Sequence, residues 1–351
     1  MKKLNPVEKL VIFGCDPEFF IAKDNEIIGS EKVLPKDGLV ANSLGGNPEN
    51  KIIIDGVQAE LNPSPRACRE LLAQEIARCF SALDTQLQKD PTLSASFKQT
   101  IEVSKEEFDT LSDDSKKFGC APSKNLYHKK ASIKADPSKY MTRSAGGHIH
   151  LGANDSTAIL KILRNTKRTI PMLDILVGNT CVLIDRDEGN IERRKNYGRA
   201  GEHRLPKHGL EYRTLSNFWL RDYRLMSFVM GLSRMAVAIV NEGLDEEFRS
   251  RVNMKKIEKA INTNNFTLAY ENFLAIEPVL SEITNSKSHK YSSPLNASNI
   301  YLFKFFVEKG LNHWFKEDPL KHWVNVNAGN RPAGWESFLD TTVSAEYKKC
   351  S

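Results

Sequence analysis

The sequence predicts an α+β fold with a mostly helical C-terminal part. Short stretches that alternate apolar and polar residues are typical of strands, and they occur at residues 10–28, 52–62, 146–152 and 209–219. Apolar residues recur at helical spacing between residues 65 and 89, and long amphipathic helices are predicted for most of the chain after residue 221. We expect one domain over residues 1–244 and a helical extension packed on it over residues 245–351.

The amino-acid composition limits the classes of protein to which this chain can belong. The 351 residues are 40% hydrophobic and 27% charged, which is usual for a soluble globular chain of one large or two medium domains. A net charge of +6 does not call for nucleic acid but suits small anionic substrates. No apolar run approaches the roughly 20 residues that span a bilayer, so we expect a cytoplasmic protein. The six cysteines lack C-x-x-C spacing, which favours reduced, buried thiols.

The N-terminal elements are predicted from the positions of proline, glycine and asparagine. Two short strands surround "GCDPEFF", and the second closes in a turn at "KDNE". Residues 29–51 are rich in Gly, Asn, Pro and Lys, and we expect a loop or flap. The next strand carries Glu60 on its polar face, and Ser64 with Pro65 is expected to start a helix that ends near Lys89.

The segment "GGHIHLG" at residues 146–152 is the most distinctive motif. Side chains two residues apart on a strand point to the same face. His148 and His150 are therefore expected on one face, and Ile149 and Leu151 on the other. Two imidazoles on one face suit a metal or an anion, although a partly buried strand would explain a lone H-x-H equally well.

The segments around this motif are less distinctive. Residues 98–127 are expected to form a polar β region, in which "FGCAPS" at 118–123 echoes "FGCDPE" at 13–18. A helix capped by Ser156 is expected after the histidine strand. Residues 193–207, "RRKNYGRAGEHRLPK", form a basic segment punctuated by glycine that leads into the next strand. The later helices carry an apolar stripe that we expect in the core: Leu225, Phe228, Val229, Leu232, Met235 and Ala236.

Polar side chains with functional chemistry repeat on four separate strands. They are Asp16 and Glu18, Glu60, His148 and His150, and Glu211 and Arg213. Each group alone is typical of the solvated face of a half-exposed strand. If the strands lie in one sheet, a single concave face collects carboxylates, imidazoles and an arginine, and four such groups together favour a functional site.

A face of this kind needs a counter-ion, because neighbouring carboxylates repel one another and are costly to desolvate. Oxygen ligands with one or two imidazoles suit Mg²⁺ or Mn²⁺ better than zinc. Guanidinium groups grip phosphoryl oxygens, so arginines beside the acids indicate phosphate chemistry. The arginines are Arg193, Arg194, Arg199, Arg204 and Arg213.

Four blocks of the sequence resemble a known family. "GCDPEFF", "DGVQAELNPSP", "RSAGGHIHLG" and "RRKNYGRAGEHRLPKHGLEYRTLSNFWL" are similar to the phage-type amidoligases, or carboxylate-amine ligases of type 2, of the glutamine synthetase and glutamate-cysteine ligase superfamily. The resemblance spans about residues 10–230. It implies a catalytic domain with a mainly antiparallel curved sheet of the glutamine synthetase type, and helices on its outer face. It also implies a phage protein that acts in the host cytoplasm.

The resemblance implies a role for each matching residue. The implied metal ligands are Asp16, Glu18, Glu60, His148 and Glu211, with Asp16 in place of the more usual glutamate. The implied catalytic residues are Glu211, Arg204 and Arg213, and the implied ATP contacts are His150, Arg194, Arg204 and Arg213. Asp55 is a candidate for a further acid of the site. A base for the amine is expected in the flap, with Asp37 or Glu49, or in the loop at 186–203.

The implied reaction is an ATP-dependent joining of a carboxylate to an amine through an acyl phosphate, with Mg²⁺ or Mn²⁺. A two-metal hydrolase that uses the H-x-H strand is the main alternative. The E-x-R motif formed by Glu211 and Arg213, together with the basic segment, argues against the hydrolase, since activation of water seldom needs many guanidinium groups. A non-catalytic scaffold that serves as a binding or virion component is a second alternative. The expected partners are a small-molecule or peptide carboxylate and an amine; a homo-oligomer is also possible, whereas a membrane or nucleic acid is not expected.

Overall fold

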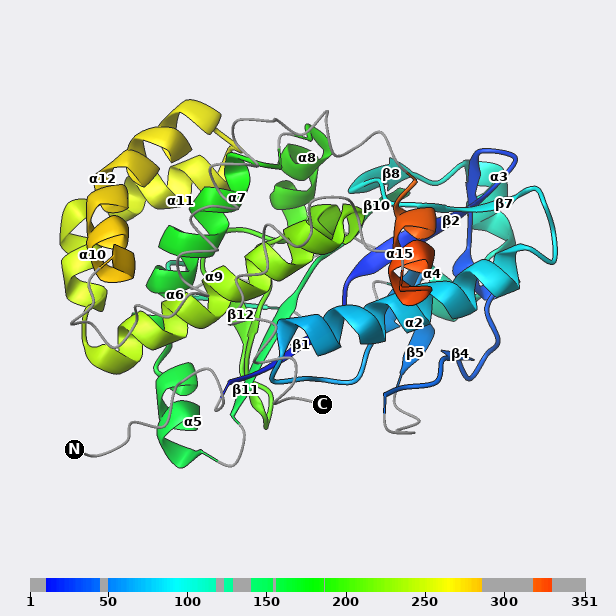
Figure 1. Ribbon diagram of the computed structural model, residues 1–351. Helices are drawn as coiled ribbons and strands as arrows, with labels where there is room; N and C mark the ends of the chain where they lie inside the picture. Colours follow the sequence, from blue (N-terminus) through cyan, green and yellow to red (C-terminus); the bar gives the residue numbers. More distant parts are fainter. Residues whose placement is uncertain are drawn as a thin grey trace.

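The strands form antiparallel sheets with helices packed against them in the computed structural model (Figure 1). The structure describes residues 11–44, 50–117, 123–128, 140–153, 156–185, 187–285 and 318–329. The predicted α+β class is confirmed. The expectations for Glu49, for most of "FGCAPS", and for Cys120 and Cys350 lie outside the described residues.

One sheet has five strands in the order β1, β11, β13, β12 and β9, and all neighbours are antiparallel. Their bounds are β1 Val11–Cys15, β11 Ile149–Ala153, β13 Gly209–Tyr212, β12 Glu202–Arg204 and β9 Lys124–Asn125. His150 lies opposite Glu211, and Glu211 lies opposite Arg204. Because directly opposed residues share a face of the sheet, this register brings the three side chains into one row.

A second sheet follows the order β3, β2, β6, β5 and β4, and β7 pairs with the other part of β2. Their bounds are β2 Glu18–Lys23, β3 Glu26–Ile28, β4 Leu39–Val40, β5 Lys51–Asp55, β6 Gln58–Asn62 and β7 Leu93–Ser96. Glu18 lies directly opposite Glu60. The polar faces therefore belong to two sheets, whereas we expected one.

Asp16 and Pro17 form the corner that joins the two sheets. Proline has no N–H to donate, so the ladder of β1 ends there and the chain turns into β2. The Pro17 carbonyl accepts from Leu61 N at 2.9 Å, and Glu18 N donates to Gly146 O at 2.8 Å. The corner thus continues β1 of the first sheet and is bonded to β6 of the second, and it places Asp16 and Glu18 where the sheets meet.

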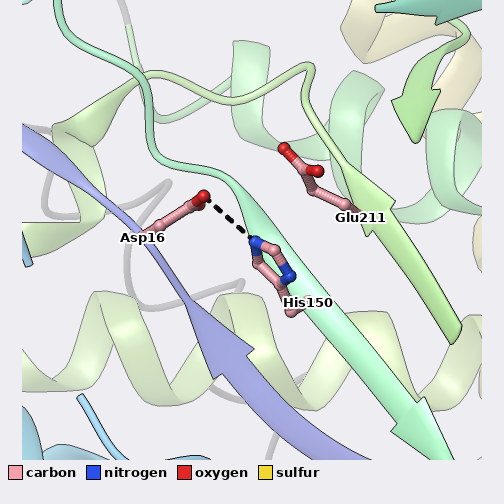
Figure 2. Close-up of side chains that lie close together, drawn as sticks. All are labelled: Asp16, His150 and Glu211. Carbon is pink, nitrogen blue, oxygen red and sulfur yellow. Dashed lines mark ion pairs between the residues drawn. The ribbon is translucent and has the colours of Figure 1, made fainter. Parts of the chain in front are cut away.

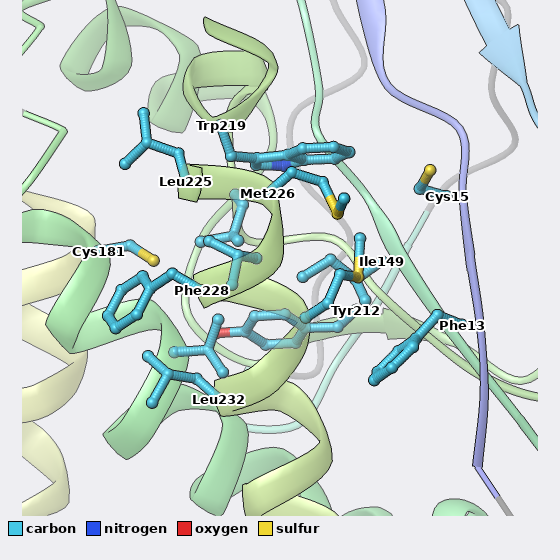
Figure 3. Close-up of a cluster of buried hydrophobic side chains, with 14 of the residues drawn as sticks. Phe13, Cys15, Ile149, Cys181, Tyr212, Trp219, Leu225, Met226, Phe228 and Leu232 are labelled. Carbon is cyan, nitrogen blue, oxygen red and sulfur yellow. The ribbon is translucent and has the colours of Figure 1, made fainter. Parts of the chain in front are cut away.

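The helices cover the apolar face of the five-stranded sheet. On this side of the fold lie α2 Arg69–Leu87, α5 Thr157–Arg164, α6 Thr166–Leu173, the π-helix Asp174–Gly178, α7 Asn179–Val182 and α9 Tyr223–Glu242. Figure 3 shows Phe13, Ile149 and Tyr212 of the sheet in one cluster with Leu225 and Phe228 of α9. All five side chains are buried. Burial of this apolar face leaves the opposite face of the sheet for polar side chains.

Helix α9 forms the centre of this core. The predicted stripe from Leu225 to Ala236 is buried, as expected. Tyr223–Glu242 is also the one helix of the described chain that is long and apolar enough to cross a membrane. Since 94% of its apolar window is buried inside the protein, it is typical of a core helix. The four described cysteines are free and buried, which agrees with the expectation of reduced thiols.

The C-terminal helices pack in two places. Helices α10 Asp245–Arg251, α11 Met254–Asn262 and α12 Phe266–Asn285 pack near α6 and α7, whereas α15 Pro319–Asn327 packs on α2 (Figure 1). Trp323 of α15 is fully buried, lies 6.0 Å from the Phe80 ring and donates to Leu220 O. The division at residue 244 stays a prediction, and Trp314 and Trp335 lie outside the described residues.

Two predicted elements were wrong in their bounds. The helix expected from Ser64 begins at Arg69, because Arg66 first forms a bridge with Phe13, with N–O distances of 2.8 and 2.9 Å. Among the described residues of the polar β region expected at 98–127, the strands are β8 Thr100–Glu102 and β9; β8 pairs with β10 Thr142–Ser144. Between them lie α3 Lys105–Thr110 and α4 Asp113–Lys116, capped by the hydroxyls of Ser104 and Ser112.

The basic segment differs from the expected loop. Its first residues belong to α8 Gly189–Asn196, and the side chains of Arg193 and Arg194 are buried. The expected flap also contains a short 3₁₀-helix, Ser30–Lys32, and the strand β4. Asp37 lies in this segment and is exposed. The helix expected after Ser156 is confirmed, since its hydroxyl accepts from Ile159 N.

Candidate functional site

Asp16 and two histidines meet at the corner between the sheets. His148 Nδ1 lies 3.3 Å from Asp16 Oδ1, and His150 Nε2 lies 3.1 Å from Asp16 Oδ2. The two imidazoles share a face because they are two residues apart, whereas Ile149 and Leu151 enter the core as predicted. His148 is fully buried, and the His150 side chain is about one-fifth exposed.

Glu211 completes the first group of ligand atoms. Figure 2 shows Asp16, His150 and Glu211 pointing toward one another from the corner, from β11 and from β13. One ligand atom from each lies within 4.8 Å of the other two, a spacing that a single cation spans. We call Asp16, His150 and Glu211 the first cluster. His148 Nδ1 is 3.8 Å from Glu211 Oε1 and borders this cluster.

Glu18, Asp55 and Glu60 form the second cluster. Their carboxylate oxygens also lie within 4.8 Å of one another. Strand pairing explains the arrangement, since Glu18 on β2 opposes Glu60 on β6 and Asp55 ends the neighbouring strand β5. Glu18 is buried and the other two side chains are partly buried. Asp55, which sequence reasoning left as a candidate, therefore joins the acids of the site.

Burial and the closeness of these acids raise the pKa values of Glu18 and Glu60. Burial, and then the negative charges of Asp16, Asp55 and Glu18, raise the pKa of Glu60 to about 9. Burial and the charge of Asp55 raise the pKa of Glu18 to about 7. Both shifts show that the folded protein disfavours the charged forms of these side chains unless a positive charge lies beside them.

The histidines beside Asp16 set the pKa values of the first cluster. Burial raises the pKa of Asp16, but His150 and His148 outweigh it, so this pKa lies well below its usual range. Burial lowers the pKa of His148 to about 4, so this imidazole is neutral at pH 7. A neutral imidazole has a lone pair that a metal ion can use. The Asp16 charge also raises the pKa of Glu60, so the two clusters lie within electrostatic reach of each other.

The donor set fits divalent cations. Asp16 Oδ1, both nitrogens of His148 and His150 Nε2 are buried and have no aligned hydrogen-bond partner in the described part of the chain. Three of these four atoms lie in ion-pair contacts, at 3.3 Å between Asp16 Oδ1 and His148 Nδ1 and at 3.1 Å between His150 Nε2 and Asp16 Oδ2. Carboxylates with one or two imidazoles are the ligands that Mg²⁺ and Mn²⁺ accept.

Two of the predicted arginines lie beside Glu211. Arg213 is buried and pairs with Glu211 through Nη1, and its Nε donates to Ser123 Oγ at 2.9 Å. Arg204 Nη1 lies 3.6 Å from Glu211 Oε1, and its side chain is 27% exposed. An exposed guanidinium beside the acids can reach a bound anion, which suits the role expected for Arg204.

Of the other three predicted arginines, Arg199 donates to Lys195 O at 2.9 Å, and Arg193 and Arg194 face the protein interior. Arg194 donates to Gly198 O at 3.3 Å and to Asn264 Oδ1 at 3.0 Å, and none of its bonds within the described residues reaches a carboxylate of either cluster. Arg193 donates to the carbonyls of Thr214 and Leu215 at 2.9 and 2.6 Å. Arg204 and Arg213 therefore lie beside the acids of the site, whereas Arg194 bonds elsewhere.

Sequence reasoning missed two side chains beside the clusters. The Tyr197 hydroxyl donates to Glu18 Oε2 at 3.2 Å, although "NYG" within a basic segment carries no signal for this contact. His208 Nε2 lies 3.0 Å from His150 Nδ1, so it orients the imidazole that faces Asp16. In the sequence, the one sign of this second contact is that His208 directly precedes the strand that contains Glu211.

Comparisons with solved structures give only distant likenesses. A bifunctional glutathione synthetase from Pasteurella multocida is 11% identical, with a TM-score of 0.48, and the match covers 97% of this chain and 51% of that one. This chain thus spans about half the length of that synthetase. A glutamine synthase homolog is 11% identical over 90% of this chain and 71% of its own, with a TM-score of 0.40. Ligand-free GmaS is 12% identical over 97% and 73%, with a TM-score of 0.39.

The comparison with protein families is more specific. No curated protein matches the sequence. The family described as phage phiEco32-like COOH.NH2 ligase-type 2 matches residues 120–295, which is half of the chain. The matched part contains both the histidine strand and β13, which ends at Tyr212 directly before Arg213. This protein therefore belongs to the phage phiEco32-like COOH.NH2 ligase-type 2 family.

Proposed function

We propose that this protein is an ATP-dependent ligase that joins a carboxylate to an amine through an acyl phosphate, with Mg²⁺ or Mn²⁺. One observation carries the proposal: two adjacent clusters of three ligand residues lie beside Arg204 and Arg213. Acids alone would suit many metal enzymes. Acids with guanidinium groups suit the transfer of a phosphoryl group, in which negative charge develops on several oxygens.

The metal ligands in this proposal are Asp16, Glu18, Glu60, His148 and Glu211, with Asp55 and His150 completing the two clusters. Bound divalent ions would neutralise the phosphate oxygens and lower the cost of placing ATP beside a substrate carboxylate. His150 lies in the first cluster, which favours a metal contact over the ATP contact expected for it.

The arginines have separate tasks in the proposed reaction. Arg213 is held by Glu211 and Ser123, so its guanidinium is fixed before ATP arrives. Arg204 is partly exposed and can follow the phosphoryl group as the acyl phosphate forms. Glu211 pairs with Arg213 and lies 3.6 Å from Arg204, so it sets the spacing between the two groups.

ADP release tests the proposal. The full chain is mixed with ATP, Mg²⁺ or Mn²⁺, and pairs drawn from a panel of acids and amines, and products are identified by mass. We expect ADP and an amide product only when acid, amine and metal are all present. Cleavage of an amide or phosphate ester without ATP would instead support the hydrolase.

A pair of matched variants links turnover to the site. Glu211→Gln removes the charge that pairs with Arg213, and we expect it to reduce ADP release by at least 100-fold. Glu102→Gln on β8 changes an exposed carboxyl on another strand and should leave turnover unchanged. Equal turnover in both variants would remove Glu211 from the mechanism. Cytoplasmic location, a phage origin and a homo-oligomer stay predictions.

A further inference from the structure

Tyr197 links the basic segment to the second cluster. It follows the last residue of α8 and has an extended backbone, which turns its side chain away from the helix. Its hydroxyl lies 3.2 Å from Glu18 Oε2 and 3.3 Å from the Ser144 carbonyl. The contact with Glu18 spans 179 positions of the sequence, so it depends on the tertiary fold.

Glu18 is held through one of its two oxygens. Oε2 accepts from Gly146 N at 2.7 Å as well as from the Tyr197 hydroxyl. Within the described part of the chain, no donor contacts the other oxygen, Oε1. A carboxylate fixed in this way keeps one oxygen available for a cation, whereas a freely rotating carboxylate loses entropy when it binds one.

The backbone beside Tyr197 leaves no room for another arrangement. A Cβ atom at Gly146 would lie 2.8 Å from the Tyr197 hydroxyl oxygen and 2.5 Å from His148 Nε2. Such distances are too short for carbon, so a larger residue here would displace the hydroxyl and the imidazole from their places beside the Glu18 carboxylate. This explains the first glycine of "GGHIHLG".

Three neighbouring side chains pack against the Tyr197 ring and hold it in place. The Arg193 guanidinium lies 4.5 Å from the ring centroid, the Arg213 guanidinium lies 6.0 Å from it, and the His148 ring meets it edge-on at 5.9 Å. Arg193 is itself fixed by backbone carbonyls, including that of Thr214. The direction of the hydroxyl is therefore set before any ligand binds.

From these contacts we infer that Tyr197 is a positioning residue, whose hydroxyl holds the Glu18 carboxylate in the orientation that binds a divalent cation. The inference rests on the proposed function, because it needs a cation at the second cluster. Tyr197 is not among the polar groups that were predicted on the four strands. The inference gives it a role because it contacts Glu18, a proposed metal ligand.

Mn²⁺ binding tests the inference without any turnover. The full chain is titrated with Mn²⁺ alone, and free Mn²⁺ is measured by electron paramagnetic resonance. Tyr197→Phe keeps the ring and its contacts but removes the hydroxyl. We expect Mn²⁺ to bind about tenfold more weakly to it than to the wild type, while the melting temperature in EDTA stays within about 2 °C. Tyr270→Phe, which changes an exposed tyrosine of α12, is the matched control and should bind Mn²⁺ as the wild type does.

A double-mutant cycle separates positioning from a general loss of structure. If the hydroxyl acts through Glu18, adding Tyr197→Phe to Glu18→Gln should weaken Mn²⁺ binding no further. Additive effects would overturn the inference, and so would a Tyr197→Phe variant that binds within twofold of the wild type. If Tyr197→Phe also proves less stable, the cycle still tests the inference. A general loss of structure would weaken Mn²⁺ binding in the Glu18→Gln background as well. Failure of the wild type to bind Mn²⁺ would count against the proposed function itself.

Discussion

Replacing Glu60 by glutamine is expected to stabilise the metal-free protein and to reduce its stabilisation by Mn²⁺. Burial and the neighbouring acids raise the pKa of Glu60 from 4.5 to about 9. The folded state thus holds the proton more tightly than the unfolded chain does. The stability from this group is complete below pH 4.5 and is lost as the pH rises toward 9. Glutamine carries no charge at any of these pH values, so the variant avoids the loss.

The magnitude follows from the width of that pH window. Each pH unit between the two pKa values costs about 1.4 kcal/mol, so the loss at pH 7 is about 3 kcal/mol before screening. The side chain is partly exposed, and solvent reduces this figure to about 2 kcal/mol. The contact between Glu60 Oε1 and Asn62 Nδ2, at 2.9 Å, remains possible for glutamine.

Urea unfolding in EDTA measures the effect. At pH 7 the free energy of unfolding of Glu60→Gln should exceed that of the wild type by about 2 kcal/mol, and the difference should almost vanish at pH 4.5. Saturating Mn²⁺ should stabilise the variant less than the wild type, because the second cluster loses a charged ligand while the first cluster keeps all of its own. A variant less stable than the wild type at pH 7, or a gain independent of pH, would refute the reasoning.

Three further changes test other parts of the structure. Burial raises the pKa of Asp174 to about 6, so the ionisation of this group alone should cost about 3 kcal/mol of stability between pH 4 and 6. Asp174→Asn should show a smaller loss in urea unfolding, and equal pH slopes would contradict the assignment. Arg204→Gln should lower ADP release about 100-fold while the melting temperature changes by less than about 2 °C, and normal turnover would exclude it from the site. Trp323→Ala should cost about 4 kcal/mol of unfolding free energy, and a loss below about 1 kcal/mol would show that α15 contributes little.

The polar faces could be predicted because strand periodicity is local. The alternation around His148 and His150 assigns each side chain to a face without knowledge of any partner strand, and the structure agrees. The division into two sheets could not be predicted, since pairing joins residues far apart in the chain. Glu18 and Glu60 oppose each other across strands separated by the whole flap.

The arginines show the limit of reasoning from residue type. Arg193 and Arg194 were candidate phosphate contacts because guanidinium groups grip phosphoryl oxygens. In the structure α8 directs them toward backbone carbonyls and toward Asn264. Carbonyl acceptors are invisible in a sequence, because every residue carries one. Tyr197 was missed for a different reason: Glu18, the carboxylate that its hydroxyl contacts, is distant in the chain.

The turn at Asp16 and Pro17 makes the spacing between β1 and β2 intolerant of change. Side chains on a strand reverse direction with every added residue. A single extra amino acid between Cys15 and Glu18 would send one of the two acids away from its cluster, whatever its identity. Segments such as the turn at Asp24 and Asn25, which only link neighbouring strands, could grow or shrink without separating any ligand from its partners.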